Sequence, residues 1–312
     1  MYDTFVRLIR GAEARSRMTD FKKIDLTHKP LFDRIFAENP PQVSELTFTN
    51  LFMWRHRNRP AWRVHDGFLF IVMRPEEEPG FALPPVGKGD VRAALEELSD
   101  DLMSLRMEPR ISRADKAFVE AHVDRKRFEV IEDPANHDYV YLTHELIELP
   151  GNKFHQKKNH LNKFIKNYKY EYQTLDTDLV DCFLNLQEVW CELKDCDLTP
   201  GLFHENQAIC QALANYEDLG FEGGAILIDK KVEAFALGEK LNPDTAVIHV
   251  EKANPDIPGL YAAINQQFCS EHWNNVTYIN REQDLGVEGL RKAKKSYHPH
   301  HMVEKFTLIR NS

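Results

Sequence analysis

The chain has 312 residues, of which 42% are hydrophobic and 29% are charged, a composition typical of globular proteins rather than disordered ones. Its formal net charge of -9 argues against a generally basic protein that coats duplex DNA, while leaving room for a local basic patch. The length suffices for two domains, each with its own core.

The cysteines indicate a reducing compartment. There are five, an odd number without a C-x-x-C pair, and all lie in segments predicted to be helical. We therefore expect reduced thiols and a cytoplasmic location. Because no apolar run approaches the roughly 18 residues needed to cross a bilayer, we expect a soluble protein that can contact a membrane only peripherally.

The first half of the chain predicts an α+β domain over residues 21–150, preceded by an arginine-rich arm over residues 1–20. Ser44 is predicted to cap a helix, and the pair Asp66-Gly67 between alternating apolar residues predicts a β-hairpin. The predicted helices are 31–36, 44–54, 90–105 and 113–123, and the predicted strands are 62–64, 68–72, 81–83 and 128–131.

A basic amphipathic helix is predicted directly after the expected domain boundary at residues 149–151. Residues 153–169 contain eight lysines and histidines, with no acidic residue before Glu171, and an apolar stripe runs through them. Such a face can simply be solvated. In a chain of net charge -9, however, this concentration of positive charge favours an anionic partner such as a phosphate, a pyrophosphate or an RNA backbone.

The second half, residues 151–312, has the more regular pattern. Short turns join three strands and therefore predict an antiparallel meander. The predicted helices are 179–193, 204–219 and 258–273, and the predicted strands are 225–228, 232–241, 245–250, 276–279 and 302–309.

A polar turn and a basic helix follow the strand that ends at Ile279. Residues 280–284 are all polar, and Asp284 is predicted to cap the helix that follows. Glu288 suits the positive N-terminal end of this helix, and the cations between Arg291 and Lys295 suit its negative C-terminal end. The alternative to a functional site here is a well-capped surface helix after an edge strand.

The order of the predicted elements is that of the acyltransferase fold of the GNAT superfamily. Residues 151–160, 249–254 and 280–294 resemble a bacterial family of unknown function related to the C-terminal catalytic domain of phosphatidylglycerol lysyltransferase, and residues 44–51 and 83–87 are similar to its N-terminal signatures. The resemblance covers the chain from about Phe21 onward. It implies two tandem GNAT-like domains, each with a mixed, mostly antiparallel sheet flanked by helices, and a site in the second.

The resemblance also implies an acyltransferase that moves an aminoacyl group from an aminoacyl-tRNA to an amine or hydroxyl of a small molecule or lipid. Residues 254–259 lack the glycine-rich pyrophosphate loop of acetyl-CoA-dependent GNAT enzymes, which disfavours an acyl-CoA donor. Two alternatives remain open. One is a non-catalytic module that binds anions or RNA on the same fold, and the other is a coenzyme A-dependent N-acetyltransferase.

Such a transfer needs a proton acceptor and groups that hold the donor. The candidate catalytic residues are Glu251 and Glu282 as proton acceptors and Asn280 to orient the substrate. Each glutamate has a structural alternative, a salt bridge with Lys252 or Arg281. The candidate substrate-binding residues are Arg281, Arg291, Lys294, Lys157 and Lys158, chosen because they suit phosphate oxygens; their alternative is a solvated surface.

No metal site or resident cofactor is predicted. His298, His300 and His301 lie around Pro299 without a carboxylate or cysteine at ligand spacing. The chain also lacks a G-x-S-x-G nucleophile elbow and a P-loop. We therefore expect direct transfer from the donor to the acceptor, without an enzyme nucleophile.

Overall fold

The chain folds into two compact units in a computed structural model that describes residues 20–194 and 199–311. Unit 1 comprises residues 20–39, 55–134 and 304–311, and unit 2 comprises residues 40–54 and 135–303. This division differs from the single boundary expected near residue 150. The expected arm, residues 1–20, lies almost wholly outside the described residues.

Unit 1 contains a mixed sheet with the strand order β1-β2-β3-β4-β6-β15-β7, in which β5 also pairs with β3. Its strands are β1 (Lys22–Lys23), β2 (Ala61–His65), β3 (Phe68–Met73), β4 (Phe81–Ala82), β5 (Val86–Gly87), β6 (Arg110–Asp115), β7 (Phe128–Glu132) and β15 (Lys305–Arg310). Its helices are α2 (Lys29–Glu38), α4 (Arg55–Asn58), α5 (Val91–Ser104) and α6 (Lys116–His122), with a 3-10 turn at Leu26–His28.

Two local predictions in unit 1 are confirmed. The β2–β3 hairpin turns at Asp66 and Gly67, both of which have positive φ angles. Helix α5 begins after Asp90, whose carboxylate accepts hydrogen bonds from two backbone N–H groups of the first turn. Leu95 and Leu98 of this helix are buried in the core of unit 1.

Unit 2 contains the sheet that positions the candidate site. Its strand order is β14-β8-β13-β12-β11-β10-β9, and every neighbouring pair is antiparallel except β12 and β13, which are parallel. The strands are β8 (Asp138–Leu142), β9 (Tyr170–Thr174), β10 (Glu222–Ile228), β11 (Lys231–Asn242), β12 (Thr245–Ala253), β13 (Tyr278–Asn280) and β14 (His301–Val303).

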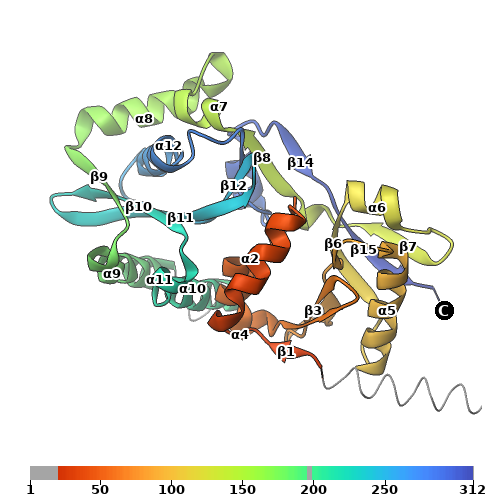
Figure 1. Ribbon diagram of the computed structural model, residues 1–312. Helices are drawn as coiled ribbons and strands as arrows, with labels where there is room; N and C mark the ends of the chain where they lie inside the picture. The colour runs from red at the N-terminus through yellow and green to blue at the C-terminus, as the bar shows by residue number, and fades with distance from the viewer. Residues whose placement is uncertain (1–19, 195–198, 312) are drawn as a thin grey trace, which may run out of the picture. The chain divides into compact units, whose positions relative to one another are not determined.

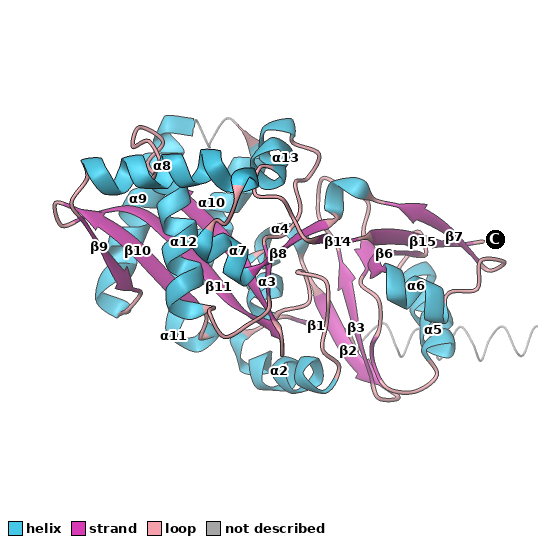
Figure 2. Ribbon diagram, turned by 90° about the horizontal axis from the view of Figure 1, so that it is seen from above, coloured by secondary structure: helices cyan, strands magenta, loops and turns pink. Residues whose placement is uncertain are grey.

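Helices cover both faces of this sheet. In Figure 1, α8 and α12 lie on one side of β10 and β11, and α9, α10 and α11 lie on the other. Figure 2 shows α12 running across these strands. The helices of unit 2 are α3 (Phe48–Met53), α7 (Thr143–Glu148), α8 (His155–Asn167), α9 (Thr177–Lys194), α10 (Pro200–Leu213), α11 (Tyr216–Leu219), α12 (Leu260–His272) and α13 (Glu288–Lys295), with a 3-10 turn at Asn152–Phe154.

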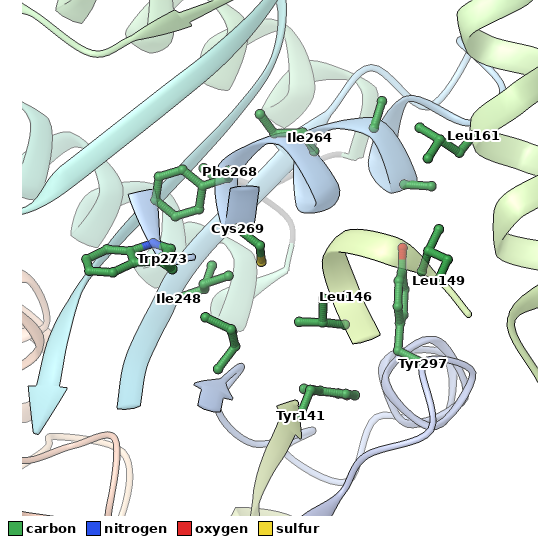
Figure 3. Close-up of a cluster of buried hydrophobic side chains, with 14 of the residues drawn as sticks. Tyr141, Leu146, Leu149, Leu161, Ile248, Ile264, Phe268, Cys269, Trp273 and Tyr297 are labelled. Atoms are coloured by element: carbon green, nitrogen blue, oxygen red, sulfur yellow. The ribbon is translucent and has the colours of Figure 1, made fainter. Parts of the chain in front are cut away.

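The core on the α12 side of the sheet is apolar and densely packed (Figure 3). Ile264 and Phe268 of α12 are fully buried, as is Ile279 of β13. Gly259 lets α12 begin close to α8, because a Cβ atom there would stand 2.3 Å from the carbonyl oxygen of His160. Within the described residues, no helix combines the length and the apolar character needed to cross a bilayer.

Two predicted helix caps are wrong. The N-cap of α3 is Thr47, whose side chain accepts from the N–H of Asn50, whereas Ser44 bonds to Asp138. The N-cap of α13 is Val287, which makes no side-chain capping bond. Ser44 bonds to Asp138, and Asp284 bonds to Tyr139. Both partners are distant in sequence, so a local pattern does not reveal them.

Several element boundaries also differ from the prediction. Strands β6, β8 and β9 and helix α7 were not predicted, and the predicted last strand is two strands, β14 and β15, which belong to different units. Cys182, Cys210 and Cys269 are free cysteines, as expected. Cys191, by contrast, is disulfide-bonded, so the expectation of reduced thiols does not hold at that position.

Candidate functional site

The candidate site lies where strands β12 and β13 separate. Their pairing covers only three residue pairs, the last of which joins Val247 to Asn280. On its other side, β12 has a bulge against β11. The register shifts between Ile248 and Val250, so His249 has no paired residue on β11. The bulge reverses the alternation of side chains between the two faces of the sheet. Glu251 therefore bonds to Asn265 of α12, whereas His249 bonds to Glu282, which in turn bonds to Asn50 of α3.

On the α12 side, Glu251 is held by two donors. Nη2 of Arg281 donates to Oε1 of Glu251 at 2.9 Å, and Nδ2 of Asn265 donates to Oε2 at 2.9 Å. Both side chains of the ion pair are largely buried, at 13% exposure for Arg281 and 11% for Glu251. Burial alone would lower the pKa of Arg281. The negative charge of the neighbouring Glu251 has the larger effect, so the pKa of Arg281 is raised.

Two cations meet at one aromatic ring. The guanidinium of Arg281 lies 4.8 Å from the ring centroid of Tyr297, and Nζ of Lys157 lies 4.0 Å from it. Nη1 of Arg281 is buried and has no hydrogen-bond partner among the residues that the structure describes. An unpaired buried donor beside a second cation is suited to an oxygen of an anionic ligand.

The lysines at this site have unusually low pKa values. Burial, reinforced by the charge of Arg281, lowers the pKa of Lys157 to about 8 and that of Lys294 to about 8. Nζ of Lys294 also donates to the carbonyl oxygen of Arg281. A bound anion would stabilise the protonated form of both amines, because it would offset the repulsion from Arg281.

On the α3 side, a histidine bridges two glutamates. His249 donates from Nδ1 to Glu282 at 2.8 Å and from Nε2 to Glu239 at 2.9 Å, and its side chain is 2% exposed. Two residues of α3 bond to the outer side of this cluster: Thr49 donates to Glu239, and Asn50 donates to Glu282. We call Glu239, His249 and Glu282 the histidine clamp.

Burial alone would lower the pKa of His249, but its hydrogen bonds to Glu239 and then to Glu282 outweigh burial and raise the pKa to about 10. The stabilisation from this charge is therefore complete below the unfolded value of 6.5 and is lost as pH rises toward 10. Lys157 and Lys294 also titrate in this range, so wild type must be compared with a variant that differs only at the clamp.

We expect the difference in unfolding free energy between wild type and His249→Gln to shrink from pH 6.5 to 10, by up to about 1.4 kcal/mol per pH unit. Chemical denaturation at half-unit pH intervals measures it. A difference that is constant across this range would show that His249 is not charged in the folded protein.

The remaining predicted site residues lie in different surroundings. Asn280 is fully buried; it donates to Asp138 at 3.0 Å and accepts from the backbone N–H of Glu282 at 2.8 Å. Lys158 lies on the exposed face of α8. Asn280 thus holds the end of β13 in place, and only Lys157 of the two neighbouring lysines reaches the ring of Tyr297.

Arg291 bonds to Asp284 rather than approaching Glu251. Its Nε donates to Oδ2 of Asp284 at 2.8 Å, and the hydroxyl of Tyr139 donates to the same carboxylate at 2.7 Å. Burial raises the pKa of Asp284, but the bonds from Arg291 and Tyr139 outweigh it and lower the pKa to about 2. Burial and this carboxylate raise the pKa of Tyr139 to about 12.

Sequence patterns missed His249, Asn265 and Tyr297 as site residues. His249 lies within a segment that carries the family resemblance, and Tyr297 lies three residues after another. This resemblance was the only sequence signal for either residue. Asn265 gave no signal, because a single asparagine in a helix has no distinctive pattern until the fold brings it to Glu251.

Comparison with known proteins relates the chain to one protein family. Residues 36–309 match the family described as phosphatidylglycerol lysyltransferase, C-terminal. A conserved protein of unknown function from Bacteroides thetaiotaomicron has a crystal structure with a TM-score of 0.88 and 36% identity, covering 93% of this chain and 99% of that one.

More distant structures share the fold. The C-terminal domain of a putative lysylphosphatidylglycerol synthetase from Agrobacterium fabrum has a TM-score of 0.66 at 12% identity, covering 92% of this chain and 93% of that one. A tandem GNAT protein from the clavulanic acid biosynthesis pathway has a TM-score of 0.50 at 9% identity, covering 92% and 97%. The predicted α+β fold of tandem GNAT-like domains is therefore confirmed.

One curated relative matches over part of its length. An uncharacterized protein of Mycoplasmoides gallisepticum is 24% identical over 174 residues, which is 54% of this chain and 54% of that protein. The alignment thus spans about half of the length of this relative.

Proposed function

Because the chain belongs to the phosphatidylglycerol lysyltransferase C-terminal family, we propose that it is an acyltransferase that moves an aminoacyl group from an aminoacyl-tRNA to an amine or hydroxyl acceptor. The observation that carries this proposal is the convergence of Lys157 and Arg281 on Tyr297, next to Glu251. This places two cations beside a carboxylate. Anion binding and proton transfer are thereby available at one point in the fold.

The two cations hold phosphate oxygens at the 3′ end of the tRNA. Nη1 of Arg281 supplies the unpaired donor, and the bound phosphate stabilises the protonated form of Lys157. The exposed lysines of α8, including Lys158, extend the positive surface toward the rest of the RNA. Arg291 is engaged by Asp284 and takes no direct part.

The transfer itself is a direct displacement. The lone pair of the acceptor forms a bond to the ester carbonyl carbon of the aminoacyl group, and Glu251 accepts the proton that the acceptor loses. The bond between the carbonyl carbon and the ribose oxygen then breaks, and the proton passes from Glu251 to that oxygen. The products are the acylated acceptor and uncharged tRNA.

Replacing Lys157 with methionine is expected to lower kcat/KM for transfer by about 10- to 100-fold, because a hydrogen bond to a charged group contributes ~1.5–3 kcal/mol. The assay follows a radiolabelled amino acid from charged tRNA onto a panel of amines and onto phosphatidylglycerol vesicles. Lys240→Met, at an exposed position on β11, serves as the control and should transfer like wild type.

Other outcomes would point to the alternatives. If charged tRNA binds through Lys157 but no acceptor is acylated, the protein is a non-catalytic RNA-binding module. If acetyl-CoA raises the melting temperature and its acetyl group is transferred, the protein is a coenzyme A-dependent N-acetyltransferase. If wild type neither binds charged tRNA nor transfers its aminoacyl group, the proposal is wrong.

A further inference from the structure

We infer that His249, held between Glu239 and Glu282, is a positioning residue that fixes Arg281 in the donor site. The inference rests on the proposed function for its catalytic consequence, but the position of Arg281 can be measured without any activity. The observation that prompts it is a strained backbone next to Arg281, at a residue whose side chain belongs to the histidine clamp.

Glu282 has a φ angle of +56°, in the left-handed region that residues with a Cβ atom rarely adopt. Such a conformation is energetically unfavourable and persists only where its surroundings enforce it. No glycine or asparagine is used at this position, although either would adopt this conformation more easily. At this position glutamate instead supplies a carboxylate that bonds to His249 and Asn50.

Contacts from several segments enforce this conformation. The backbone N–H of Glu282 donates to Asn280 at 2.8 Å, and its carbonyl oxygen accepts from the backbone N–H of Tyr139 at 3.1 Å. Its carboxylate accepts from His249 at 2.8 Å and from Asn50 at 3.2 Å. The contacts with His249 and Asn50 are the ones that depend on the glutamate side chain.

Arg281 and the strained Glu282 are neighbours in sequence, but their side chains bond to different partners. Arg281 bonds to Glu251 and lies over Tyr297, whereas Glu282 bonds to His249 and Asn50. The backbone N–H of Arg281 donates to Tyr139 at 2.9 Å, so both residues are tied to the same point of β8. Movement of Glu282 would therefore displace the base of the Arg281 side chain.

Glu282 is a weaker candidate than Glu251 for the proton acceptor. Its carboxylate bonds to His249 and Asn50, whereas the carboxylate of Glu251 bonds directly to Arg281 of the proposed donor site. Glu239, on the far side of His249, is likewise held by Thr49. Together these bonds form a fixed support on one side of Arg281, while Glu251 remains beside the two cations on the other.

The first experiment measures the exposure of Arg281 in the full-length protein. Phenylglyoxal modifies accessible arginines, and mass spectrometry of the peptides reports the rate at each one. In His249→Gln, Arg281 should react at least severalfold faster than in wild type, because loss of the clamp opens this segment locally. Arg291, tied to Asp284, is the internal reference and should react at an unchanged rate.

The matched control is His272→Gln. His272 also bonds to a glutamate, Glu222, but it lies at the end of α12 and outside the clamp. The rate at Arg281 in this variant should equal that of wild type. Equal rates at Arg281 in His249→Gln and His272→Gln would overturn the inference.

A second variant, Glu282→Gly, removes the clamp carboxylate but tolerates the backbone conformation. Glycine adopts a positive φ without strain, which offsets part of the stability lost with the bond to His249, so the variant should fold but melt at a lower temperature than wild type. Arg281 should nevertheless react faster, because the clamp has lost one of its carboxylates. Wild-type reactivity of Arg281 in folded Glu282→Gly would show that the backbone alone holds Arg281, and would also overturn the inference.

The catalytic consequence is tested in the transfer assay. Misplacement of Arg281 should lower kcat/KM by about 10- to 100-fold in both His249→Gln and Glu282→Gly. If wild type transfers nothing, the proposed function fails while the modification rates still decide the role of the clamp. If wild type is active and both variants retain full activity despite a more reactive Arg281, the clamp does not serve catalysis.

Discussion

Replacing Arg281 with methionine should abolish aminoacyl transfer and lower the free energy of unfolding by about 3 kcal/mol. The substitution removes both the proposed contact to the donor phosphate and the partner of Glu251, whose side chain is only 11% exposed. A carboxylate left in such a place without its counter-ion is poorly solvated. Transfer assays and urea denaturation measure the two effects separately.

Two further variants show whether the effect depends on the guanidinium group and on its position. Arg281→Lys keeps the charge but not the planar fork, so it should recover part of the stability and little of the activity. Arg291→Met removes an exposed guanidinium from Asp284 and tests whether any arginine near β13 has the same effect. Near-normal transfer by Arg281→Met would exclude Arg281 from donor binding.

Glu251→Gln should lower kcat by about 100- to 10,000-fold, the range expected when a general base is lost. Glutamine has almost the same shape and can still accept the hydrogen bond from Asn265, but it leaves the buried Arg281 without its counter-ion, so the variant should fold with reduced stability, which urea denaturation measures. Because the donor is held by Lys157 and Arg281, KM for charged tRNA should change much less than kcat.

The matched control for this experiment is Glu233→Gln. Glu233 lies on β11, is 8% exposed and accepts a hydrogen bond from Asn254 at 2.8 Å. It therefore resembles Glu251 in burial and bonding, but it does not bond to Lys157 or Arg281. It should transfer normally. A rise in KM without a fall in kcat for Glu251→Gln would assign Glu251 to ground-state binding rather than to proton transfer.

Local patterns predicted much of the fold. Hairpin-length turns identified the β10–β11–β12 meander, the basic run identified α8, and Pro258-Gly259 marked the start of α12. These features depend on neighbours in sequence, so one sequence reveals them. The polar turn after β13 also marked Arg281 as a candidate, but its pairing with Glu251, 30 positions away, was only one of several salt bridges left open.

Long-range pairing could not be predicted in this way. Segment 40–54 belongs to unit 2, although residues on both sides of it belong to unit 1. Its Asn50 reaches Glu282, which is 232 positions away in the chain. No turn or periodicity encodes such a contact. The histidine clamp likewise joins residues from two strands and a loop, and Glu282 was first interpreted as a base because its partners were unknown.

Strand β15 has a consequence for the order in which the protein can fold during synthesis. It pairs with both β6 and β7, so it is an interior strand of the unit 1 sheet, yet it consists of residues 305–310. Until the ribosome releases this stretch, β6 and β7 have no strand between them, and their apolar faces remain incompletely covered. Unit 1 therefore contains residues 20–39, which emerge before any residue of unit 2, but its sheet is completed only after all of unit 2 has emerged.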